Sequence, residues 1–222
     1  MCVDATTSMI AFSVSVVCSY LLWNGTKNDR FFSIGVFLIG LIQLNEFFLW
    51  RNQTCGIVNH LFSLSIVVIL WLQSVLMLSS FYLFYPVRIL PSFVTDVYLV
   101  SCTAFTAYLL SILHQTRLCS RPKGCRLAWS AYTYLSKERP ALLWIHFLFY
   151  FIPFFIFFVE TFAYHRDDAL RYKVRYAFLP FTFAVAIIYK GFLTSPLSYA
   201  DVFGSLWCFL SVALGIIGVL HI

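Results

Sequence analysis

A carboxylate inside an apolar segment is the side chain of this sequence most able to do chemistry. Glu46 lies in the stretch Gln43–Arg51, at the end of a long apolar run and five residues before Arg51. At a rise of about 1.5 Å per residue, it lies about 7 Å inside the apolar limit. A charge in hydrocarbon costs on the order of a few kcal/mol, so such a residue marks a functional site by default. We expect Glu46 to bear charge or accept a proton in a buried polar pocket.

Further polar side chains are expected at a similar depth. His146 comes six residues after Pro140, a proline suited to the first turn of a helix, so it lies too deep to cap that helix. Because the unperturbed pKa of a histidine is close to neutrality, His146 is the expected partner of Glu46. The other side chains expected to bind ligand or water are Gln43, Asn59, His60, Gln73 and Asp201.

The same residues also have a purely structural interpretation. Glu46 could be paired or capped by amides only to set helix register, while Asp201, Asn59 and His60 could cap helices at the water interface. By residue type, the possible ligands of a metal ion are Glu46, His60, His146 and Asp201. No ligand pair at helical i, i+3 or i, i+4 spacing supports a metal site, so we expect neither a metal nor a cofactor.

Composition requires a membrane. The chain has 222 residues, of which 61% are hydrophobic and 11% charged, whereas ordinary soluble domains are about 25% charged. The apolar runs are about 20 residues long and do not alternate with polar residues, which favours helices over the strands of a barrel. We predict an all-α integral membrane protein, a single polytopic domain over residues 1–222, without a soluble domain or a cleavable signal.

Seven spans are predicted for this bundle. They are Ala5–Trp23, Phe31–Trp50, Ile57–Tyr82, Ser92–Leu113, Pro140–Tyr164, Tyr176–Tyr189 and Tyr199 to the C-terminus. The one long loop, residues 114–139, falls on the same side as the N-terminus. Within it, Leu127–Ser130 together with Tyr132 and Tyr134 could form an interfacial segment or part of a lid over the pocket.

The basic residues indicate how the chain crosses the bilayer. The net charge of +6 lies in loops beside spans, where it is typical of topology and lipid headgroup contact rather than of nucleic-acid binding. Lys and Arg divide almost evenly between the two sides, but none precedes the first span, whereas Lys27 and Arg30 follow it. This bias favours a cytoplasmic C-terminus and an extracellular or lumenal N-terminus and long loop.

Cysteine positions favour the same orientation. Four of the seven cysteines fall on the N-terminal side: Cys2, Cys55, Cys119 and Cys125. Two disulfides on an oxidising face would explain this clustering. Cys119 and Cys125 bracket a turn-forming segment that can close a small ring, which would leave Cys2 to tether Cys55. Three pairings are possible, and the sequence does not choose among them. A four-thiolate zinc site on a cytosolic face is the alternative, although it lacks a CxxC pair.

Several known membrane classes do not fit. A retinal Schiff base needs a lysine deep in a helix, and the last span has none. The usual receptor motifs and the histidine spacing of a ceramidase-type zinc hydrolase are missing, as are GxSxG and HExxH.

A set of short motifs runs along nearly the whole chain. They are Met1-Cys2, Glu46, Cys55, Asn59, Cys119, Gly124, Leu127–Ser130, His146, Pro153–Phe155 and Ser205–Cys208. In these the sequence resembles a group of small multi-pass membrane proteins of large DNA viruses, algae and other protists. It departs from that group at Val3-Asp4, where the group has Phe-Ser. The resemblance implies a multi-pass membrane fold and emphasises the residues already chosen, but it supplies no activity.

Three hypotheses for function remain. The first is a membrane protein that binds a small or lipid-like ligand, or moves a proton or small solute, through the Glu46/His146 pocket. The second is an intramembrane lipid-modifying enzyme with the same two residues as an acid–base pair. The third is a structural or assembly protein without a ligand, whose polar groups satisfy one another.

Overall fold

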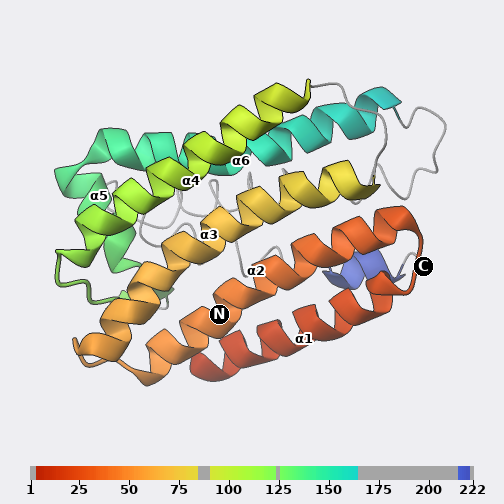
Figure 1. The fold of residues 1–222 in the computed structure, drawn as a ribbon. Coiled ribbons are helices and arrows are strands. Elements are labelled where there is room, and N and C mark those ends of the chain that lie inside the picture. Colours follow the sequence, from red (N-terminus) through yellow and green to blue (C-terminus); the bar gives the residue numbers. More distant parts are fainter. Residues whose placement is uncertain (1–3, 85–90, 124–125, 165–214, 221–222) are drawn as a thin grey trace, which may run out of the picture.

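The computed structural model describes residues 4–84, 91–123, 126–164 and 215–220, shown in colour in Figure 1. Besides a helical segment at residues 215–220, six helices and a short antiparallel hairpin are assigned in this part of the chain. They are α1 (Ala5–Trp23), α2 (Lys27–Arg51), α3 (Ile57–Phe84), α4 (Ser92–His114), β1 (Arg121–Lys123), β2 (Arg126–Ala128), α5 (Ser130–Glu138) and α6 (Pro140–Tyr164). The chain is an all-α membrane protein in its described architecture, apart from the three-residue strands.

Helix length and hydropathy support a membrane setting. Within the described ranges, α1, α2, α3 and α4 are long and apolar enough to cross a bilayer. Helix α6 is 25 residues long, and its portion Pro140–Pro153 is a further apolar helix. The predicted bounds of the first and fifth spans agree with α1 and α6. The sixth span and nearly all of the seventh, with Asp201, lie outside the described residues.

The start of α2 differs from the prediction. The sequence predicts that the second span begins at Phe31, but the helix already begins at Lys27. A capping box explains the early start: the backbone N–H of Asp29 donates to Thr26 Oγ1, and the Asp29 carboxylate accepts from the backbone N–H of Thr26 at 2.9 Å. This reciprocal pair satisfies two helix-end donors and so extends the helix toward the N-terminus.

Helices α1 and α2 pack through small residues. The buried face of α1 carries Ser8, Ala11, Ser15 and Cys18, spaced three or four residues apart. Opposite Ser15 lies Gly40 of α2, where an added Cβ would come within 2.6 Å of the Ser15 Cβ. In lipid there is little hydrophobic drive between helices, so close backbone approach and polar contacts hold them together. The hydroxyls of Ser19 and Ser33 supply such a contact at 2.8 Å.

The remaining helices extend this pair into a bundle. Helix α3 contacts α2 on one side and α4 and α6 on the other. The turn at 52–56, the hairpin and α5 gather at one end of the bundle, and the turn between α1 and α2 lies at the opposite end (Figure 1). We refer to the first as the loop end.

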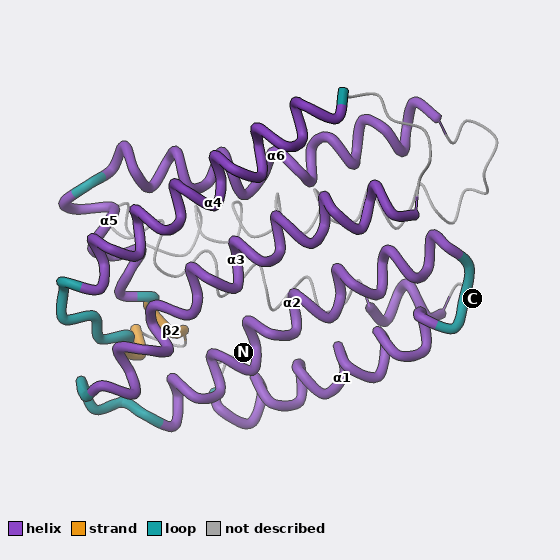
Figure 2. The backbone as a smooth tube through the Cα atoms, viewed as in Figure 1, coloured by secondary structure: helices purple, strands orange, loops and turns teal. Residues whose placement is uncertain are grey.

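The long loop is a folded element rather than an open connection. Figure 2 shows the hairpin and α5 at the loop end of the bundle, in the connection that leads along the chain from α4 to α6, and Pro122 is paired with Leu127 in the hairpin. Leu127, Trp129 and Leu135 are at most 1% exposed and belong to the same apolar core as Ile42 of α2 and Ile66 of α3. The loop therefore packs into the bundle at this end.

Candidate functional site: a buried polar layer closed by the loop

Glu46 is bound by the loop. Its side chain is 0% exposed, and its Oε1 accepts a hydrogen bond of 2.9 Å from the indole Nε1 of Trp129, which is 1% exposed. Trp129 comes directly before α5, 83 residues along the chain from Glu46. A hydrogen bond to a buried carboxylate is among the stronger ones in proteins, on the order of 1.5–3 kcal/mol net. The loop thus closes the layer through a polar contact as well as through apolar packing.

His146 is bound by the same segment. Its Nε2 lies 2.7 Å from the hydroxyl of Tyr132, one turn into α5, and the histidine is 3% exposed. The Tyr132 ring in turn contacts the Trp129 ring, with centroids 5.6 Å apart. Two aromatic side chains, one from the residue before α5 and one from its first turn, therefore reach the two residues chosen from sequence.

This arrangement differs from the predicted pairing of Glu46 with His146. Each of these two side chains has a hydrogen bond to a different aromatic residue, Trp129 for the acid and Tyr132 for the histidine. The loop segment before α6 thus supplies the hydrogen-bond partner of each of the two side chains.

Gln43 lies one helical turn from Glu46 on the same face of α2. The side chain is 0% exposed, and neither its Oε1 nor its Nε2 has a hydrogen-bond partner in the described part of the chain. Leaving a buried amide group unsatisfied costs about 1–3 kcal/mol. In this Gln43 differs from Asn59 and Gln73, whose side-chain amides have partners on both the nitrogen and the oxygen.

Gln73 belongs to a second, deeper layer. Its Nε2 donates to the backbone oxygen of Leu38 at 2.8 Å, and its Oε1 accepts from the Tyr150 hydroxyl at 2.8 Å. Leu38 lies eight residues before Glu46, which is about 12 Å along a helix. Gln73 thus ties α3 to α2 and α6 below the Glu46 layer, and its amide is satisfied there.

Asn59 holds the loop through its side-chain amide. Its Nδ2 donates to the backbone oxygens of Asn52 at 2.7 Å and Ser120 at 2.9 Å, and its Oδ1 accepts from the Ser120 N–H at 2.8 Å. Ser120 extends this network through its hydroxyl to Ser63, at 2.8 Å, and to Ser130, at 3.2 Å. These contacts fix the segment before β1 and the start of α5 against α3.

His60 lies at the edge of the site. Its Nδ1 accepts from the backbone N–H of Leu118 at 3.3 Å, and its ring lies 5.8 Å from that of His114. It contacts the connection after α4 and is not part of the Glu46 layer. Among the described residues, no group of three or more His, Cys, Asp or Glu side chains is placed to hold a metal ion.

A disulfide is present among the four cysteines assigned to the N-terminal side, in one of the pairings that the sequence left open. Cys55 in the turn after α2 is bonded to Cys119 before β1, with 5.1 Å between their Cα atoms. This excludes the small ring between Cys119 and Cys125, because the network around Asn59 brings Cys119 to the 52–56 turn instead. Cys2 and Cys125 lie outside the described residues.

Sequence reasoning missed the roles of Trp129 and Tyr132 as partners of the acid and the histidine. A signal was available: an indole and a phenol three residues apart lie on one helical face, and both carry a donor that must be satisfied when the ring is buried. The sequence does not show how deeply α5 lies within the helix bundle.

Comparisons with family models, with curated proteins and with solved structures find no match to this chain. The resemblance to the viral and protist membrane proteins therefore stays a prediction, and function has to be argued from the site.

Proposed function

We propose that this protein is a seven-span membrane protein that takes up a proton, or a small polar or lipid-like ligand, at a buried layer around Glu46, Gln43 and His146. The loop segment bearing Trp129 and Tyr132 closes this layer toward the N-terminal side. In this proposal that side is extracellular or lumenal and the C-terminus is cytoplasmic. Glu46 is the proton-accepting or charge-bearing group.

The observation that carries the proposal is the amide of Gln43. A packing device would satisfy its own polar groups, as Gln73 and Asn59 do in this structure. Gln43 instead keeps two polar atoms buried and without a partner in the described ranges, one turn from a buried carboxylate. A polar ligand or a hydrated proton reaching Glu46 would meet a donor and an acceptor already in place.

The contact between Tyr132 and His146 supports a coupling between the layer and the loop. A neutral imidazole can accept the phenolic proton at Nε2, whereas a protonated imidazole can only donate there. A change in the charge of His146 would therefore reverse the hydrogen bond that holds α5. This gives α5 the role of a lid whose attachment depends on the protonation of the layer.

A structural role is the second candidate, and a specific observation favours it. Both Glu46 and His146 have hydrogen bonds within the protein, to Trp129 and Tyr132. These contacts alone would explain why the two polar residues are buried.

The substitution Glu46→Gln separates the two candidates. The amide oxygen of a glutamine can still accept the indole N–H of Trp129, so the variant keeps that contact but cannot be ionised. We expect the full chain in liposomes, loaded with a pH-sensitive dye and driven by a potassium diffusion potential, to lose its proton flux on this change. Infrared difference spectra after a pH jump should lose a carboxyl band at the same time.

Asp96→Asn is the matched control, because Asp96 is an exposed carboxylate on α4. That variant should keep both signals. If Glu46→Gln equals the parent protein in flux and in the infrared spectrum, the layer is a packing device and the proposal fails.

A further inference from the structure

A cleft of about 450 Å³ opens at the loop end, between the segment before β1, the strand itself and α5. It is separate from the Glu46 layer, since Glu46 and His146 do not line it. A volume of this size is in the range of small-ligand sites, which is roughly 300–1,000 Å³. The cleft would hold a compact polar group such as a headgroup.

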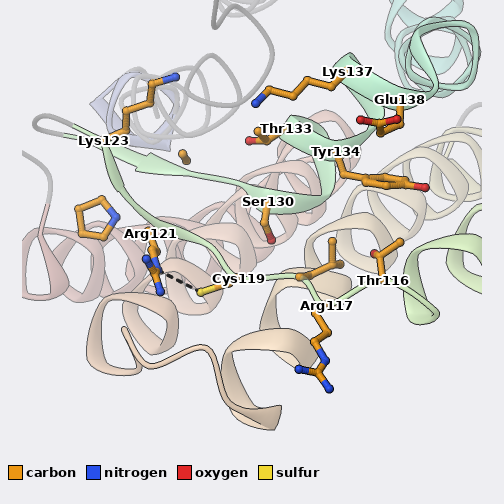
Figure 3. A pocket seen from close by; sticks show the side chains of 13 residues that line it. Thr116, Arg117, Cys119, Arg121, Lys123, Ser130, Thr133, Tyr134, Lys137 and Glu138 are labelled. Carbon is orange, nitrogen blue, oxygen red and sulfur yellow. Dashed lines mark hydrogen bonds between the residues drawn. The ribbon is translucent and has the colours of Figure 1, made fainter.

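The lining of the cleft is strongly basic. Arg121 and Lys123 come from β1 and Lys137 from α5, while Glu138 is the carboxylate among the lining residues that the structure describes. Figure 3 shows Lys123 and Lys137 extending toward the same space, with Glu138 on the other side of Lys137, next to Tyr134. Cations from two elements facing one space create a positive field that favours an anion.

Neutral donors complete the lining. The hydroxyl side chains of Ser130 and Thr133 lie below the two lysines in Figure 3. Hydroxyl and ammonium donors around one space suit the several acceptor oxygens of a phosphate group. A halide or a lone carboxylate would use these donors less completely.

The walls of the cleft are held in place before any ligand arrives. The guanidinium of Arg121 donates from Nη2 to Cys55 Sγ at 2.8 Å and from Nε to Cys119 Sγ at 3.3 Å. Sulfur is a weak acceptor, so this contact orients the arginine while leaving its positive charge in place. The disulfide and the Asn59 network fix the base of β1 in the same way. A preorganised site loses less entropy when it binds.

The position in the fold agrees with a ligand at the membrane surface. Helix α5 buries Ala131, Tyr132 and Leu135 and exposes Lys137 and Glu138, and the apolar helix α6 begins two residues later. Basic residues directly beside an apolar helix lie at the depth of lipid headgroups.

We propose that the cleft between β1 and α5 binds a phosphate-bearing anion, through Lys123, Lys137 and Arg121 with the nearby hydroxyls. The phosphate can come from an anionic phospholipid headgroup or from a soluble phosphate compound. This proposal is independent of proton uptake at Glu46.

The test uses the purified full chain in neutral detergent. One arm measures the affinity for inorganic phosphate against chloride at matched ionic strength, and the other the affinity for phosphatidylglycerol against phosphatidylcholine in mixed micelles. The double variant Lys123→Gln/Lys137→Gln should bind at least about tenfold more weakly, since hydrogen bonds to charged groups contribute more than 1.4 kcal/mol. The control Arg51→Gln/Arg139→Gln removes the same charge outside the cleft and should retain binding.

Binding of inorganic phosphate in the first arm and of phosphatidylglycerol in the second assigns a general anion site. Binding of phosphatidylglycerol alone assigns the source of the phosphate as lipid. Equal weakening in the two double variants would show that only the overall charge attracts anions, and would overturn the proposal, as would no preference in either arm.

The parent protein supplies a readout that needs no variant. Phosphate or phosphatidylglycerol, whichever binds, should protect Lys123 and Lys137 from acetylation, measured by mass spectrometry. Lys27, at the opposite end of the bundle, should not be protected, and equal modification of all three lysines would also overturn the proposal.

Discussion

A single indole N–H links the loop to the buried acid of this bundle. Trp129 donates to Glu46 at 2.9 Å, and both side chains are at most 1% exposed. Burial makes this contact matter, because a carboxylate that loses a donor in a dry environment cannot recover it from water.

The substitution Trp129→Phe should therefore destabilise the protein. It removes the donor and keeps an aromatic ring, and we expect the free energy of unfolding to fall by about 1–3 kcal/mol, seen as a lower Tm in detergent. Trp144→Phe, at a ring that is 71% exposed, should leave the Tm nearly unchanged. A double-mutant cycle with Glu46→Leu isolates the hydrogen bond from the lost ring area. A coupling energy near zero would mean that Trp129 acts only by filling space.

At the scale of elements, the pairing of α1 with α2 depends on small residues at the contact between the two helices. Gly40 meets Ser15 so closely that any Cβ there would lie 2.6 Å from the Ser15 Cβ. At Gly35 of the same helix, an added Cβ would meet the flexible Met77 side chain, at 3.2 Å, and no other side chain among the described residues. The two glycines thus differ in what surrounds them, although both lie in apolar sequence.

Gly40→Ala should separate α1 from α2 and cost about 1–3 kcal/mol, the usual range for overpacking. Thermal unfolding in detergent measures the change. Adding Ser15→Gly removes the atom that clashes and should restore most of the stability. Gly35→Ala serves as the control and should cost less, because Met77 can adjust. A loss that Ser15→Gly does not relieve would place the strain elsewhere.

At the scale of the whole molecule, the disulfide joins the two connections that form the loop end. It links positions separated by 64 residues, one in the turn after α2 and the other after α4. Such a cross-link limits the unfolded chain and contributes up to about 4 kcal/mol by the chain-entropy model.

Cys119→Ser should lower the Tm and loosen the hairpin, while Cys18→Ala, at a buried free thiol, should change little. Mass spectrometry of tryptic peptides without reduction should find Cys55 and Cys119 linked in protein made in cells. The same measurement bears on the proposed orientation, since disulfides form and persist in oxidising compartments. A reduced pair in freshly isolated protein would contradict an extracellular or lumenal loop end.

Much of the helical framework was predictable from the order of residues. The bounds of α1 and α6 and the start of α3 and α4 agree with the predicted spans, because apolar runs interrupted by Gly, Pro and charge are local features. Burial of Gln43, Glu46, Asn59, Gln73 and His146 was also expected, since polar residues inside apolar helices face protein. The start of α2 was missed because the charged residues 27–30 were assigned to a turn, although Thr26 and Asp29 have the spacing of a capping box.

The sequence alone thus determined that the chain lies in a membrane, where its helices run, and which polar residues face the interior of the bundle. Only the tertiary structure decided which of these residues meet. Glu46 and Trp129 are 83 residues apart, as Tyr150 and Gln73 are 77, and no local periodicity encodes such contacts. The depth to which α5 enters the bundle depends on apolar packing and on the Asn59–Ser120 network together. At that depth the loop covers the polar layer around Glu46. The basic cleft lies on the outer face of the loop.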